Sequence, residues 1–258
     1  MNYWAKRQAN IQDKLNKLAE KKIQQQMVKY YATAAKTAIK EFEAVYEKIM
    51  SRKEEGKEVT PADLYKLDKY WEMQGQLRAQ LRKLGEKQVA LLTKNFELHY
   101  FDIYYSLGLK GGEAFSTIDK GVVRRLIDSV WVADSKTFSQ RIWDNVSRLT
   151  TTLNDELINC VAVGRKTSQL KKILQERFNV SYRRAETLVR TELCHIQTEA
   201  AKHRYKDYGV QYFEVLVDPD AKTCDLCKEL IGKKFSINDA SPLPVHPNER
   251  CCVVPVVD

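Results

Sequence analysis

The sequence predicts a mainly α-helical protein that ends in a small α+β module with short strands. Glycine and proline are scarce, with 10 and 6 copies in 258 residues, which favours helices over sandwiches or barrels. Apolar residues recur at helical spacing through most of the chain, whereas glycine, proline, asparagine and aspartate gather after residue 209. We therefore expect a long helical hairpin over residues 1–107, a domain of shorter helices over residues 108–209, and a zinc-knuckle-like Cys/His metal-binding module over residues 210–258.

The hairpin is predicted from two long apolar stripes. The first runs from Ile11 to Met50 in steps of three to five residues, with Lys, Glu and Gln filling the other face. A charged stretch around Gly56 interrupts it, and Thr60-Pro61 followed by Asp63 is typical of a helix start. A second helix then runs toward Tyr105. Two such long helices suit a protein that reaches across a partner's surface, so we expect a scaffold or docking role for this half.

Shorter helices are predicted in the middle of the chain. One is expected to end at Gly164, at a position that often takes the left-handed conformation. Two more are expected, the first from Leu170 to Phe178 and the last from Tyr182 to Tyr208. The loop that opens this part is marked by Gly108, Gly111 and Gly112.

After Gly209 the hydrophobic period changes from helical to alternating. Residues 211–217 and 251–257 are candidate strands on this basis. The loop-rich sequence between them predicts a module with little apolar core of its own.

Charge is distributed unevenly along the chain. The formal net charge is +9, yet the stretch from Gln211 to the end has only five Lys and Arg against eight Asp and Glu. The helical body therefore carries the basic excess and would attract polyanions, either nucleic acid or an acidic protein surface. Solvated lysine-rich helix faces are the alternative reading of the same pattern.

No apolar run approaches the length that a membrane span needs, and the N-terminus lacks the apolar stretch of a secretory signal. We therefore expect a protein that stays in a reducing cytoplasm. Thiols there remain reduced, so the six cysteines are expected to bind metal more readily than to pair as disulfides.

The tail contains the spacing of a tetrahedral metal site. A Cys-x-x-Cys turn places two thiolates, those of Cys224 and Cys227, on one side of a tight knuckle. His246 and Cys251, separated by four residues, supply two further ligands. Four protein ligands leave no position for a catalytic water, so the expected cofactor is one structural Zn²⁺.

Three alternatives compete with zinc. A redox Cys-x-x-Cys needs a βαβ context that is absent here. A disulfide between Cys224 and Cys227 would leave His246 without a role, and chance clustering of four cysteines in the tail remains the third alternative. Cys252 could replace Cys251 as the fourth ligand, so the choice between these two stays open.

Other chemistry-bearing residues give weaker signals. Glu192, His195 and Glu199 share one helix face and form half of a di-iron pattern, but the second half is missing. A structural network of Arg190 and Glu192 with a neighbouring helix is the better interpretation. Cys160 and Cys194 are expected to be core thiols. No phosphate loop, nucleophile elbow or dinucleotide fingerprint is present, so we expect no enzymatic activity and no catalytic or cofactor-binding residues.

Together these motifs resemble the phage head morphogenesis family, the minor head (minor capsid) proteins of tailed bacteriophages. The specific signature runs from about Arg165 to Pro255, and the family's closing motif usually reads H-P-N-C-R-C. Here Glu249 stands in place of the first cysteine of that motif, and Cys252 is an added one. The motifs that carry the resemblance are Arg190-Thr191-Glu192, Asp218 with Thr223-Cys224-x-x-Cys227, Leu230-x-Gly232-x-x-Phe235 and His246-Pro247-Asn248-x-Arg250-Cys251, and the opening Tyr3-Trp4-x-x-Arg7 is also similar to family members.

The resemblance implies a low-copy virion protein that associates with the portal vertex during procapsid assembly. It implies the portal or the major capsid protein as partner and a place in the head interior, reached from the host cytoplasm. Related proteins are linked to DNA packaging or delivery, which makes nonspecific contact with packaged DNA a further expectation. A nucleic-acid-binding protein with a zinc-stabilised module is the alternative function, whereas a phage-delivered nuclease or toxin lacks an identifiable acid/base cluster.

Overall fold

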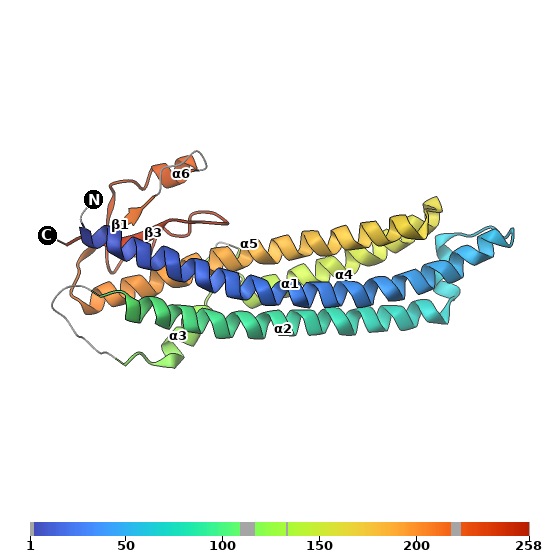
Figure 1. The fold of residues 1–258 in the computed structure, drawn as a ribbon, viewed down its shortest axis with the longest axis horizontal. Helices are drawn as coiled ribbons and strands as arrows, with labels where there is room; N and C mark the ends of the chain where they lie inside the picture. Colours follow the sequence, from blue (N-terminus) through green and yellow to red (C-terminus); the bar gives the residue numbers. More distant parts are fainter. Residues whose placement is uncertain (1–2, 109–116, 133, 218–222, 258) are drawn as a thin grey trace. The chain divides into compact units, whose positions relative to one another are not determined.

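The computed structural model describes residues 3–108, 117–132, 134–217 and 223–257, and it confirms a mainly helical chain that ends in a small antiparallel sheet (Figure 1). Gly111, Gly112 and Asp218 lie outside the described residues. The elements are, in order, α1 (Tyr3–Glu54), the 3₁₀ helix η1 (Pro61–Lys66), α2 (Asp68–Ser106), α3 (Lys120–Ile127), α4 (Phe138–Val163), α5 (Thr167–Asp207), β1 (Tyr212–Leu216), α6 (Asp225–Lys228), β2 (Lys234–Ser236) and β3 (Cys252–Pro255).

The long N-terminal helices are present, but the second one begins later than predicted. Thr60 is the N-cap that the sequence indicates, and its backbone N–H donates to Asp63 at 2.9 Å. This cap begins the short 3₁₀ helix η1, and α2 begins only at Asp68. At the end of α4, Gly164 has φ +69° and occupies the predicted terminal position, while the Arg165 amide donates to the carbonyl of Cys160.

One predicted helix boundary is wrong. The two helices expected over residues 170–178 and 182–208 form a single helix, α5, of 41 residues. Ser181, which lies at the expected break, is buried inside this helix. Its backbone carbonyl accepts a hydrogen bond from Asn145 at 2.9 Å, so a partner on α4 stabilises the polar residue in place.

The described residues form two compact units, and neither is a single stretch of chain. The first unit comprises residues 1–24, 91–138 and 186–258, and the second comprises residues 25–90 and 139–185. The long helices α1, α2 and α5 therefore each contribute to both units.

The second unit is a helical bundle with a buried polar centre. The Tyr31 hydroxyl on α1 lies 3.3 Å from the side-chain oxygen of Gln88 on α2 and 3.3 Å from the hydroxyl of Ser181 on α5. The side-chain amide of Asn145 on α4 donates to the Tyr31 oxygen at 3.2 Å. One tyrosine thus connects all four helices, and burial raises the pKa of Tyr31 to about 12.

Two glycines of α2 in this unit give a matched pair of substitutions. Gly85→Ala should destabilise the protein, because a Cβ there would lie 2.5 Å from the Trp143 ring and force that side chain to move. Gly75→Ala meets nothing within 4 Å and should stabilise it by roughly 0.5–1 kcal/mol, since alanine is the better helix former. Guanidinium denaturation of both variants tests this. Equal stabilisation by both variants would show that the Trp143 side chain moves aside at no cost in free energy.

The first unit joins the start of α1 to the C-terminal sheet (Figure 1). The sheet is antiparallel with strand order β2-β1-β3, and Phe213 of β1 stands opposite Phe235 of β2 and Pro255 of β3. Cys252 and Val254 of β3 pack against small side chains of α1, namely Ala5 and Ala9. The strands predicted over residues 211–217 and 251–257 are confirmed, and the short strand β2 is an addition.

A single α1 side chain fixes the edge of this sheet. The amide of Gln12 donates to the carbonyl of Val253 at 2.8 Å, and Tyr205 of α5 donates to the same carbonyl at 3.3 Å. Both side chains are buried.

None of the described helices combines the length and apolar character that crossing a bilayer requires.

Candidate metal centre

The predicted metal ligands lie in the first unit, in the module that follows β1. Two segments contribute them: the turn that opens into α6, and the segment from His246 to Cys251 that leads into β3. Cys224, Cys227, His246 and Cys251 belong to one cluster that can hold a metal ion. Its members form two overlapping groups, Cys224–Cys227–His246 and Cys227–Glu249–Cys251, and within each group the donor atoms lie within 4.8 Å of one another.

The first half of the cluster is a helix-capping turn. Cys224 is the N-cap of α6, and its sulfur accepts a hydrogen bond from the Cys227 amide at 3.4 Å. The same turn brings the two Sγ atoms to 3.4 Å. The amide of Cys227 lowers the pKa of the Cys224 thiol, whereas burial raises the pKa of Cys227 to about 12. The knuckle predicted from the spacing is therefore present, and its half-buried thiol, Cys224, is the readier of the two to ionise.

The imidazole of His246 is oriented for ligation through Nε2. Nδ1 lies 2.8 Å from the carbonyl oxygen of Pro247, which can only accept, so Nδ1 carries the proton. This hydrogen bond raises the pKa of His246, and it leaves the lone pair of the neutral ring on Nε2. Nε2 lies 3.3 Å from the sulfur of Cys227. Metal-bound histidines are commonly fixed by such a carbonyl.

Glu249 is a member of the cluster that was not among the predicted ligands. Its Oε2 lies 3.4 Å from the sulfur of Cys227 and 3.5 Å from Nε2 of His246. The turn that aims it there contains Asn248 at φ +62°, a conformation that asparagine tolerates better than most residues. One signal in the sequence pointed to it, because Glu249 occupies the place of a cysteine in the motif that the chain resembles.

Cys251 and Cys252 point to different surroundings, as consecutive residues do on entering a strand. Cys251 belongs to the donor cluster together with Cys227 and Glu249. Cys252 packs instead against Ala5, Ala9 and Val254. Of the two cysteines that the sequence left open, the structure thus places only Cys251 among the described donor groups. Cys160 and Cys194 are buried helical thiols outside both groups, as expected.

Helix α5 holds the second half of the cluster through the Arg190-Thr191-Glu192 motif and its neighbour. The Thr191 hydroxyl accepts a hydrogen bond from the Asn248 amide at 3.2 Å, and the Cys194 thiol donates to the Cys251 carbonyl at 3.7 Å. Arg190 pairs with Glu20 of α1 at 2.6 Å, which agrees with the structural network expected for this motif. The motif therefore connects α1, α5 and the segment that carries the ligands.

The acidic face of α5 is structural rather than metal-binding. Trp131 donates through Nε1 to Glu192 at 3.0 Å and stacks on His195 with ring centroids 4.3 Å apart. Among the described residues, neither Glu192 nor His195 belongs to a group of donor atoms that can hold a metal. Burial lowers the pKa of His195 to about 4, so its ring is neutral at pH 7.

Replacing Thr191 by valine tests its support of the cluster. The change removes the acceptor of the Asn248 amide, so we expect a loss of up to about 1 kcal/mol of stability and a roughly tenfold weaker zinc affinity. Zinc competition with a chromogenic chelator measures the second effect. The matched control is Thr37→Val, whose hydroxyl donates only to the carbonyl four residues earlier, as that of Thr191 also does. Equal zinc affinity in both variants would exclude this role.

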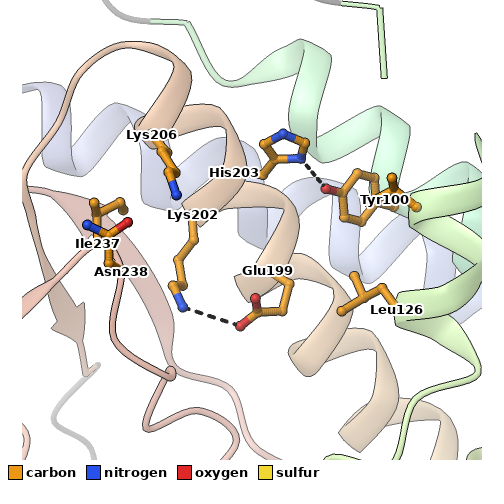
Figure 2. Close-up of a pocket in the computed structure, with 9 residues that line it drawn as sticks. Tyr100, Leu126, Glu199, Lys202, His203, Lys206, Ile237 and Asn238 are labelled. Atoms are coloured by element: carbon orange, nitrogen blue, oxygen red, sulfur yellow. Dashed lines mark hydrogen bonds and ion pairs between the residues drawn. The ribbon is translucent and has the colours of Figure 1, made fainter. Parts of the chain in front are cut away.

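A separate cavity of about 280 Å³ lies in the same unit, where α5 faces α2, α3 and the segment after β2 (Figure 2). Glu199, Lys202 and His203 in its lining are paired with neighbours. Lys202 donates to the Asp239 carbonyl at 2.7 Å and lies 3.6 Å from Glu199, while the Tyr100 hydroxyl meets Nδ1 of His203 at 2.6 Å. This pairing leaves no strong charge directed into the cavity by those side chains, so it indicates no ligand class. The lining residues are Tyr100, Val122, Leu126, Glu199, Lys202, His203, Lys206, Ile237 and Asn238.

Long helices, a small antiparallel sheet and a cluster of Cys and His donors define a mainly helical protein whose C-terminal part could hold a metal ion. Residues 151–254 match the model of the family described as Phage Mu protein F like protein, so this segment belongs to that family of phage head morphogenesis (minor head) proteins. The matched segment begins within α4 and ends in β3, and it therefore contains α5 and the whole donor cluster. No curated protein and no solved structure matches the chain.

Proposed function

We propose that the protein is a structural minor head protein that acts in procapsid assembly at the portal vertex of a tailed phage or prophage. The match of residues 151–254 to a phage head family carries this proposal, because that family's role is head morphogenesis. Its partner would be the portal or the major capsid protein, and its place would be the head interior. A purely structural role, without enzymatic activity, accords with the family.

The metal cluster supports the proposal by giving the matched segment a rigid end. We propose that one structural zinc ion is held by Cys224, Cys227 and His246 together with one donor from the turn at residues 249–251, where the sequence favours Cys251. Thiolates and imidazole are the ligands that zinc prefers, and four of them close the coordination sphere. The ion would then keep a small module with a sheet of three short strands in one conformation for docking.

Co-expression with the portal and major capsid proteins of the same phage tests the assembly role. Procapsids purified from this mixture should contain the protein, and procapsids assembled without the portal should contain much less of it. Mass spectrometry of the purified particles gives the copy number in each case. Absence from both kinds of particle would exclude the proposed role, and equal amounts in both would place the contact on the capsid protein.

The charge pattern favours DNA as a second partner. Basic residues exceed acidic ones in the helical body, whereas the tail after residue 210 is acidic. Binding to phosphates would weaken steeply as salt rises, with a slope set by the number of contacts. Titration of double-stranded DNA at several salt concentrations measures this slope. A DNA affinity that is negligible, or that does not change with salt concentration, would argue against DNA as a partner and leave proteins as the partners.

A further inference from the structure

Glu249 is a buried carboxylate whose surroundings resemble the inside of a metal site. Its side chain is only 2% exposed, although a buried charge is costly unless a partner compensates it. Burial raises the pKa of Glu249, but hydrogen bonds from the Cys251 thiol and from two backbone amides outweigh burial and lower it. Three hydrogen bonds therefore hold the carboxylate in place inside the cluster.

Both oxygens of Glu249 lie near the Cys227 sulfur, at 3.7 Å for Oε1 and 3.4 Å for Oε2, but their other partners differ. Oε1 accepts from the amides of Arg250 at 2.9 Å and Cys251 at 3.1 Å, which fixes the orientation of the group. Oε2 is directed at Cys227 and His246, themselves two of the predicted ligands. The oxygen that faces the cluster thus keeps a lone pair directed at the position where a cation would lie.

Four donor-to-donor distances in the cluster fit tetrahedral zinc. Donor atoms at 2.0–2.3 Å from a tetrahedral ion lie about 3.3–3.8 Å apart. From the sulfur of Cys227, the neighbouring donors lie at 3.4 Å (Cys224), 3.3 Å (His246) and 3.4 Å (Glu249). From Nε2 of His246, the Glu249 oxygen lies at 3.5 Å.

We propose that Glu249 is the fourth zinc ligand, so that the site is formed by two thiolates, one imidazole and one carboxylate. This assignment rests on the zinc site proposed above. Glu249 and Cys251 both lie in the group with Cys227, and Glu249 also lies 3.5 Å from Nε2 of His246, a member of the other group. The Cys251 thiol donates a hydrogen bond to the Glu249 carboxylate. Cys251 therefore orients the fourth ligand from outside the coordination sphere.

Cobalt(II) substitution of the full-length protein tests the assignment, because thiolate-to-cobalt absorption grows with each bound thiolate. The wild type should show the absorption of two thiolates, and Cys251→Ser should leave its intensity unchanged. Cys224→Ser should abolish this absorption, because the variant loses the metal. Glu249→Gln, which keeps the size but weakens the ligand, should lower cobalt and zinc affinity at least tenfold. Glu249→Cys should add a third thiolate band while the protein stays folded.

The alternative outcomes separate the ligand assignment from the metal site itself. A three-thiolate spectrum that loses about a third of its intensity in Cys251→Ser, with Glu249→Gln binding as the wild type does, would make Cys251 the fourth ligand. Failure of the wild type to bind cobalt or zinc would overturn the metal site and this assignment together. Circular dichroism of each variant shows whether a loss of binding reflects a missing ligand or a failure to fold.

Discussion

Replacing Cys224 by serine should remove the metal from the protein and unfold the C-terminal module. In small metal-dependent modules the metal supplies about 10–16 kcal/mol of binding free energy at pH 7, and this energy drives folding. The module has strands of only five, three and four residues, so we expect the metal to supply much of its folding free energy. Hydrogen exchange should show lost protection in β1, β2 and β3, together with loss of bound zinc in elemental analysis.

Cys252→Ala is the matched control for this experiment. It removes a thiol only one residue from the cluster, but that thiol packs against Ala5 and Ala9 rather than facing the donor groups. We expect it to keep about one zinc ion and strand protection, with a modest loss of stability from the smaller side chain. A metal-free wild type, or equal zinc loss in both variants, would contradict the predicted site.

Phe42→Ala should destabilise the helical second unit by about 3–5 kcal/mol. The Phe42 ring is completely buried in α1, so truncation leaves a cavity in a close-packed bundle. A loss of this size is a large fraction of the total stability of a typical domain. Guanidinium denaturation followed by circular dichroism measures it, and hydrogen exchange should place the lost protection within residues 25–90 and 139–185.

Val28→Ala on the same helix is the control, because Val28 is 50% exposed. Its effect should stay within about 0.5 kcal/mol, since an exposed substitution creates no cavity. A comparable loss of stability in both variants would mean that α1 contributes through its helical propensity rather than through the packing of Phe42.

The helices were predictable because their apolar stripes are local information, whereas the continuity of α5 was not. The polar residues near position 181 resemble a break in the sequence, yet Ser181 is satisfied by Tyr31 and Asn145, which lie on other helices. Such long-range partners leave no local pattern. The strand β2 was missed for a related reason, because three residues form a strand only by pairing with β1.

The residues of the metal cluster also differ in how far the sequence alone indicates them. Cys224, Cys227 and His246 follow a spacing that a sequence displays directly. The sequence marks Glu249 only as a departure from the motif that the chain resembles. Its direction toward the cluster comes from the turn at Asn248, whose positive φ depends on the fold around it. The support from Thr191 is likewise tertiary, because 57 residues separate it from its partner.

The interleaved path of the chain has a consequence for synthesis on the ribosome. All residues of the second unit, up to residue 185, are translated before the last stretch of the first unit. Gln12, by contrast, cannot form its hydrogen bond to the Val253 carbonyl until that residue, 241 positions later in the chain, has been translated. Closing so long a loop is slow, and it carries an entropy cost that only the completed contacts repay. The Gln12 amide therefore lacks this acceptor until Val253 has been translated, and a chain that stops before Val253 cannot close the contact between α1 and β3.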